Sequence, residues 1–472
     1  MVTYRLLTFL MIFAAFCSNG LFAAEPNETA LTVYNDNFAV VRQSRQMDFE
    51  QGVNEVKFTG VAANIDPTSV NFKCLSAPGA VSILEQNYQY DLVNANKLLD
   101  RYIEKKVSLW IADGADDRKY LQGTLMAAVG GDLIIKTEDG IEIVNRADLS
   151  QIILEELPDD LLTRPTLIWL AKAKKSGSQL CRIAYTTDNV NWNADYSVIL
   201  NPDDTRLDFS GWVTINNRSG IGYENAKLKL IAGDVRRIRQ QRGRQPQAMY
   251  EMAARAASAD KAGFKEKGFM EYHMYTLGRR TTVKNNEVKQ IEFIEPAEDV
   301  AVDKIFVYEK KPRWFYQRDN QEDKIRVELE FKNTEQNNLG IPLPAGKVRV
   351  FKNDPADDTL EFVGEDKIDH TAADEELSLY IGNAFDITPE YTLVDGTYRD
   401  NYQREVHKIE LRNAKETAVM VMVEHQFAPR RNWRVQEASH SYEKTDANTI
   451  RFAVKVAAKS SSTLKYTTTE TW

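Results

Sequence analysis

The chain has few of the side chains that most often carry chemistry. Its 472 residues include three cysteines and five histidines. Neither type occurs in a metal-binding pattern, because C-x-x-C, H-x-H and H-E-x-x-H are all missing. The phosphate-binding patterns G-x-x-x-x-G-K-[ST] and G-x-G-x-x-G and the nucleophile pattern G-x-S-x-G are missing too. Local motifs therefore predict no metal site, no cofactor and no catalytic residue.

Two further absences concern charge and long apolar runs. The 60 basic and 69 acidic residues give a net charge of −9, which argues against a general nucleic-acid binder. The one long apolar run, Leu6 to Phe16, is about half the roughly 20 residues that span a bilayer. Arg5 precedes this run and Ala23-Ala24 follows it, which is typical of a secretory signal peptide over residues 1–24. We therefore expect an exported protein, periplasmic or extracellular, without a transmembrane span.

Cysteine is too scarce to hold the fold together. Cys17 lies in the signal region, and the bulky Phe16 before it disfavours a lipoprotein cysteine. Only Cys74 and Cys181 remain in the mature chain, so one intramolecular disulfide is available at most. The sequence leaves open whether they pair, and it leaves the oligomeric state open as well. The fold must depend on apolar cores, and a chain of this length suggests several domains.

The patterns that are present are those of β-strands. Apolar and charged residues alternate over residues 324–331 and again over residues 450–456, as in strands covered on one face. Ala418 to Val423 (AVMVMV) is apolar on both faces and predicts a central strand buried on two sides. Helical periodicity is clear only from Asn94 to Lys106. We predict a mainly-β protein with β-sandwich domains, a small SH3-like or Sm-like barrel and very little helix.

The stretch from Gly211 to Asp234 contains four glycines and resembles a phosphate loop at first sight. A phosphate loop requires a strand before it and a helix after it. Here the residues after the glycines, such as Leu228 and Leu230, alternate with lysines in strand periodicity. The stretch therefore predicts two strands joined by a long loop.

The pattern divides the mature chain into three blocks. We expect a small β-domain over residues 25–95, the small barrel over residues 96–158 and a β-sandwich region over residues 159–472. A segment within the last block, residues 236–267, holds nine basic and three acidic residues and predicts a flexible basic insertion. It is either a solvated loop or a polybasic arm for anionic envelope polymers.

Several segments of the third block together resemble one family. These are Thr186 to Leu200 (TTDNVNWNADYSVIL), Glu271 to Glu295 and Lys408 to Phe427. They look like the DUF4139 family of largely uncharacterised exported bacterial proteins, over roughly residues 165–472. The resemblance implies a β-sandwich and an exported setting, and it implies no catalytic residues. Its Trp-x-Ala-x-Tyr core would place Trp192, Ala194 and Tyr196 on one strand face.

Aromatic residues beside arginines are the best candidates for a binding surface. Trp314, Phe315, Tyr316 and Trp433 lie in such polar, basic contexts. We therefore predict a non-enzymatic exported protein that binds a cell-envelope protein or polysaccharide.

The alternative is an envelope hydrolase whose site is assembled from scattered carboxylates and histidines. Either His425 with its neighbour Glu424, or His273 with Glu271 two residues before it, would supply its acid and base groups. Convergence of such groups in a deep cleft would favour the hydrolase.

Overall fold

Strands dominate the protein. The computed structural model describes residues 27–90, 95–112, 118–155, 164–233, 235–237, 260–261, 263–270, 272–311, 324–357 and 359–472. Within these ranges α1 (Ala95–Arg101) is the one α-helix. The predicted mainly-β class is confirmed. The chain forms two compact units: Arg42–Val61 and Pro67–Tyr185 belong to the first, and Ala30–Val41, Ala62–Asp66 and Thr186–Trp472 to the second.

Unit 1 contains a three-stranded antiparallel sheet in the order β3 (Gly52–Thr59), β11 (Thr166–Ala173), β5 (Val81–Gln89). Its core is built around Trp169, which is buried and whose ring lies 5.5 Å from that of Phe58 and 5.6 Å from that of Phe72. A short strand, β4 (Asn71–Cys74), pairs with β12 (Gly177–Asp188) and places Cys74 directly opposite Cys181.

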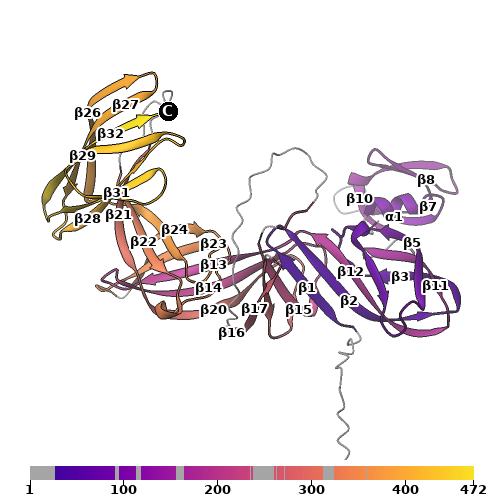
Figure 1. Ribbon diagram of the computed structural model, residues 1–472. Coiled ribbons are helices and arrows are strands. Elements are labelled where there is room, and N and C mark those ends of the chain that lie inside the picture. Colours follow the sequence, from indigo (N-terminus) through magenta and orange to yellow (C-terminus); the bar gives the residue numbers. More distant parts are fainter. Residues whose placement is uncertain are drawn as a thin grey trace, which may run out of the picture. The chain divides into compact units, whose positions relative to one another are not determined.

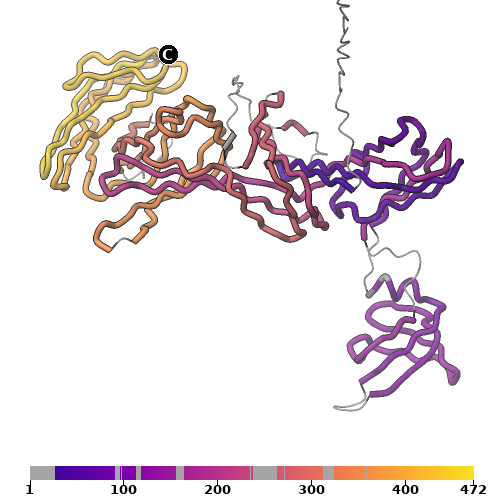
Figure 2. The backbone as a smooth tube through the Cα atoms, turned by 90° about the horizontal axis from the view of Figure 1, so that it is seen from below, coloured from indigo at the N-terminus to yellow at the C-terminus, as the bar shows by residue number. Residues whose placement is uncertain are grey.

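The middle of unit 1 is a five-stranded antiparallel sheet that follows α1. Its strands are β6 (Lys106–Ala112), β7 (Arg118–Val129), β8 (Asp132–Lys136), β9 (Ile141–Asn145) and β10 (Leu149–Ile153), in the order β10-β6-β7-β8-β9. Its own core holds Leu99 from α1 with Leu109, Leu125 and Ile135 from the strands. Figure 2 traces this group in purple. Within the described residues no ladder joins β9 to β10, so the sheet is open where a closed barrel was expected.

The first part of unit 2 is a sheet in the order β20 (Glu287–Ala301), β14 (Arg206–Asn217), β13 (Val190–Leu200), β23 (Gly346–Asp354), β24 (Thr359–Ile368). Trp192, Ala194 and Tyr196 on β13 share one face, as predicted, and each is 1% exposed. The Trp192 Nε1–H donates to the Ile231 carbonyl at 3.1 Å. The Tyr196 hydroxyl donates to the Pro344 carbonyl at 2.8 Å, so both polar atoms are satisfied inside the core.

The glycine-rich stretch forms two strands and a loop, as predicted. β14 ends at Asn217 and β15 (Tyr223–Ala232) begins after a five-residue connection. β15 pairs in parallel with β1 (Thr29–Tyr34) and antiparallel with β18 (Tyr272–Leu277) and β19 (Thr281–Val283). The amide of Asn217, which is buried, donates to the Ile221 carbonyl at 2.8 Å and to the Lys284 carbonyl at 3.0 Å. This asparagine closes the loop.

The basic segment ends in regular structure that the sequence pattern did not predict. β16 (Asp260–Lys261) pairs with β17 (Phe264–Phe269), and β17 pairs with β18. Residues 238–259 of the segment lie outside the described residues. Main-chain pairing to β18 holds residues 264–267 as a strand, although their lysines and glutamate give little apolar pattern.

The C-terminal part of unit 2 is a sandwich of two sheets, drawn in orange and yellow in Figure 1. One sheet has the order β25 (Glu376–Asn383), β22 (Arg326–Lys332), β21 (Asp303–Lys310), β28 (Val419–Gln426), β31 (Thr449–Val456), β30 (Tyr442–Lys444). The other has the order β26 (Ile387–Arg399), β27 (Tyr402–Asn413), β32 (Ser460–Thr471), β29 (Asn432–Ala438). Tyr308, Val421 and Phe452 of the first sheet pack in one core with Ile409 and Tyr466 of the second.

The alternating pattern is confirmed in β31. In β22, Leu329 and Phe331 are buried as predicted, but Glu328 of the charged row is buried as well. The prediction of a two-sided strand at Ala418–Val423 is wrong. β28 is central in its sheet, between β21 and β31. Val421 and Val423 are fully buried, whereas Met420 is 43% exposed. The second sheet covers the inward row of β28, and the flexible methionine side chains occupy the outward row.

Candidate functional site

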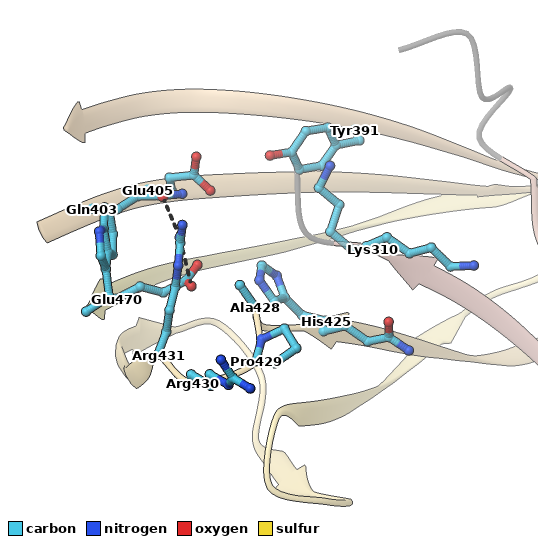
Figure 3. A pocket seen from close by; sticks show the side chains of 13 residues that line it. Lys310, Tyr391, Gln403, Glu405, His425, Ala428, Pro429, Arg430, Arg431 and Glu470 are labelled. Carbon is cyan, nitrogen blue, oxygen red and sulfur yellow. Dashed lines mark hydrogen bonds and ion pairs between the residues drawn. The ribbon is translucent and has the colours of Figure 1, made fainter. Parts of the chain in front are cut away.

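A cavity of about 270 Å³ lies at one end of the C-terminal sandwich. The ends of β21 and β28 contribute to it from one sheet, and β26, β27 and β32 from the other. The loop after β28 completes the wall. The lining residues, shown in Figure 3, are Lys310, Lys311, Tyr391, Gln403, Glu405, His425, Gln426, Ala428, Pro429, Arg430, Arg431, Glu470 and Trp472.

Two buried histidines form a polar cluster at this cavity. His425 lines it and is 5% exposed, and its Nδ1 lies 2.8 Å from the Tyr466 hydroxyl. The ring of His407, which is fully buried, lies 4.9 Å from the His425 ring. His407 Nδ1 is 3.0 Å from the Tyr391 hydroxyl, and Nε2 is 2.9 Å from Thr468 Oγ1. Both ring nitrogens of His407 therefore have hydrogen-bonding partners.

The cluster is electrically neutral at physiological pH. Burial, together with the smaller effect of the positive charge of Lys310, lowers the pKa of His407 to about 3. Burial also holds the pKa of His425 well below its ordinary value, with His407 and Lys310 acting in the same direction. Burial raises the pKa of Tyr466 well above its ordinary value. With pKa values this low, His407 and His425 are too weakly basic to act as general bases near pH 7. The cluster therefore acts as a fixed set of hydrogen bonds.

Charged groups surround this neutral cluster. Lys310 Nζ lies 3.9 Å above the centre of the Tyr391 ring. Arg431 Nη1 is 3.1 Å from Gln403 Oε1 and 3.3 Å from Glu470 Oε2 (Figure 3). Burial raises the pKa of Glu470, and Arg431 opposes that shift. The lining holds four basic side chains and two acidic ones, which is an excess of positive charge.

Trp433, predicted as a binding residue, is separated from the cavity-lining His425 by the ring of Phe427. Its indole stacks on Phe427 with ring centres 4.3 Å apart, and Phe427 in turn lies 4.5 Å from the His425 ring. The Trp433 Nε1–H donates to the Ala447 carbonyl at 3.0 Å. It is half-buried in the sandwich core and does not line the cavity.

The other predicted binding residues, Trp314, Phe315 and Tyr316, lie outside the described residues. They follow Lys311, a lining residue, by three to five positions in the sequence.

The structure pairs the candidate histidines differently from the sequence hypothesis. Glu424 points away from its neighbour His425 and binds the Arg451 guanidinium at 2.7 and 2.9 Å, because adjacent strand residues face opposite sides. The carboxylate that contacts His273 Nδ1, at 2.9 Å, belongs to Glu266 on β17. Glu271 lies outside the described residues. Across the described ranges, no group of three or more His, Cys, Asp or Glu side chains is arranged to hold a metal ion.

Sequence reasoning missed that His407 and His425 meet. A signal existed within each strand, because both histidines continue an inward-facing apolar row. His407 precedes Ile409 and Leu411 at two-residue spacing, and His425 follows Val421 and Val423 in the same way. A histidine at a core-facing position is a sign of a buried polar network. Nothing local shows that the two rows face each other.

The architecture and the cavity together define an all-β sandwich protein with a cationic, histidine-lined pocket. Residues 181–472 match the family described as a domain of unknown function, DUF4139, and the match covers more than half of the chain. The chain therefore belongs to the DUF4139 family. The matched range contains every residue that lines the cavity. A comparison with the curated proteins finds no match. Within the described residues, no helix is long and apolar enough to cross a membrane.

Proposed function

We propose that this chain is an exported, non-enzymatic binding protein of the cell envelope, and that the sandwich cavity receives an acidic polysaccharide. The observation that carries the proposal is the pairing of cations with aromatic rings in the lining. Lys310 lies over Tyr391, and Arg431 lies 4.0 Å above the Trp472 ring, which is 47% exposed. A uronic acid offers a carboxylate for the cations and a sugar ring for the aromatic surface.

The polar groups of the cavity suit binding better than hydrolysis. The alternative, a hydrolase, gains from the convergence of Glu405, Glu470 and His425 in one cavity. Each of these groups is engaged in the resting protein, however. Arg431 holds Glu470 at 3.3 Å, and the Tyr398 hydroxyl donates to Glu405 Oε1 at 2.8 Å. The low pKa of His425 leaves it a poor base. Binding needs only the hydrogen bonds and charges that these groups already present.

The proposal is tested by calorimetric titration of the full chain with oligogalacturonate and with the same oligosaccharide after reduction of its carboxylates. We expect the acidic form to bind at least about tenfold more tightly, because the cations lose their partner in the reduced form. Binding of the acidic form should weaken as salt is added. Equal affinity for both forms would contradict the proposal, and binding of an acidic peptide alone would replace the glycan with a protein partner.

A matched pair of variants assigns the binding to the cavity. Lys310→Met keeps the apolar stem over Tyr391 and removes the charge, and it should weaken oligogalacturonate binding about tenfold. Lys415→Met is the control, because Lys415 lies 5.7 Å above the Phe306 ring and does not line the cavity. Equal effects of the two substitutions would show that general charge, and not this cavity, determines binding.

A further inference from the structure

A second cavity, of about 150 Å³, lies in unit 2 and shares no lining residue with the first. It is formed by β17, β18 and β20 together with the loop after β22. Three buried aromatic rings and several aliphatic side chains make up most of its wall: Phe264, Tyr275, Phe293, Ile294, Leu339, Ile341 and Pro342. Phe293 meets Phe264 and Tyr275 edge to face, with ring centres 5.8 and 4.9 Å apart.

One buried carboxylate lines this apolar cavity. The side chain of Glu266 lines it and is 4% exposed. Its Oε1 lies 2.9 Å from His273 Nδ1. Its Oε2 is buried and has no hydrogen-bond partner among the described residues. Buried carboxylate oxygens nearly always accept hydrogen bonds, so this atom marks a position where a donor is missing.

The lining indicates which donor would fit. It contains two acidic residues, Glu266 and Glu295, and no lysine or arginine. A carboxylate forms its strongest hydrogen bonds with charged N–H donors, and aromatic walls attract cations. One water molecule takes about 30 Å³ in the liquid, so the cavity has room for about five heavy atoms of that size.

We propose that this cavity binds a small organic ammonium ion. The ammonium group donates to the Glu266 carboxylate, and a short alkyl chain packs against Phe264, Phe293 and the aliphatic wall. The site lies apart from the glycan cavity and does not rest on the function proposed for it.

The test uses three probes of nearly equal size: butylammonium, 1-butanol and butyrate. Ligand-observed NMR titration of the full chain should give butylammonium an affinity at least about tenfold above that of 1-butanol, with no binding of butyrate. Butylammonium should also raise the melting temperature. The proposal is overturned when 1-butanol binds as tightly as butylammonium, or when butyrate binds.

Glu266→Gln keeps the size of the side chain and an oxygen that accepts from His273, but it removes the charge. We expect it to abolish the preference for butylammonium over 1-butanol. Glu292→Gln is the control, because Glu292 is exposed on β20 beside Phe293 and does not line the cavity. Unchanged preference in Glu266→Gln, or equal loss in both variants, would overturn the assignment.

Two further readouts keep the outcomes separable. Should Glu266→Gln not fold, the three probes on the parent protein decide the matter alone. Lys310→Met should bind butylammonium with the affinity of the parent protein. A negative result in the oligogalacturonate titration would therefore not contradict the proposed ammonium site.

Discussion

Lowering the pH below about 6.5 should destabilise the C-terminal sandwich through its buried histidines. The folded-state pKa of His407 is about 3, against an ordinary value of 6.5. The unfolded chain therefore binds the proton first, and the stability that this group contributes is complete above pH 6.5 and is lost progressively as pH falls towards 3. At pH 5 the pH lies 1.5 units below the pKa of 6.5 of the imidazole in the unfolded chain. At 1.36 kcal/mol per unit, protonation of His407 in the unfolded chain then lowers the free energy of unfolding by roughly 2 kcal/mol.

The cost arises because the folded protein cannot accommodate a charge at this position. His407 is fully buried, and the Lys310 charge disfavours an imidazolium there. Glu405 lies 3.6 Å from Nε2, and the pKa of His407 is low despite this carboxylate. His425 acts in the same direction as His407, whereas the raised pKa of Glu470 acts in the opposite direction. A comparison between variants isolates the contribution of His407 because the other groups are common to both proteins.

The assay is urea unfolding at pH 7.5 and pH 5, with hydrogen exchange of β27, β28 and β32 peptides to identify the unit that unfolds. His407→Gln can still donate to and accept from Tyr391 and Thr468, and it should lose roughly 2 kcal/mol of the parent's pH dependence. His440→Gln, a substitution in a surface turn, should retain the parent's slope. A parent free energy of unfolding that is flat between the two pH values, or an equal slope in His407→Gln, would refute the reasoning.

Three further predictions concern the core, the thiols and the N-terminus. Trp192→Ala should lower the free energy of unfolding by about 3–5 kcal/mol, because Trp192 is buried in the core. Trp212→Ala, on the exposed face of β14, should lower it by less than about 1 kcal/mol. Similar losses in the two variants would contradict the core assignment. Diamide should join Cys74 to Cys181 by a disulfide, because the two cysteines are direct partners on neighbouring strands. The reaction should be slow, because burial raises the pKa of Cys181 to about 12. Two alkylatable thiols after long oxidation would disprove this. Mass spectrometry of the protein from the cell-envelope fraction should find cleavage after Ala23 or Ala24, and an intact Met1 would count against cleavage and export.

The strand content was predictable because each amphipathic strand carries its own two-residue period. The row of Trp192, Ala194 and Tyr196 could be placed in a core from spacing alone. The exposure of Met420 could not, because it depends on whether a second sheet covers that face. Likewise, β17 owes its strand structure to pairing with β18, which no local pattern encodes.

The candidate site was less predictable because long-range pairing builds it. His407 and His425 are 18 residues apart in the sequence and lie in different sheets. The sandwich brings their rings within 4.9 Å. The aromatic-and-arginine criterion identified Trp433, which the structure places in the packing against Phe427. It did not identify Lys310 or Tyr391, because their cation–π contact joins two strands that are far apart in the sequence, and no local pattern predicts it.

The most direct test of the glycan cavity is histidine NMR during an oligogalacturonate titration of the full chain. Of the two clustered histidines, His425 lines the cavity and His407 does not. His440 lies outside the cluster, in a surface turn. We predict a saturable shift of the His425 ring resonance, with His440 unchanged and with a smaller shift in Lys310→Met at the same concentration. A His425 resonance that stays fixed while the oligosaccharide binds would contradict the proposal that this cavity is the binding site.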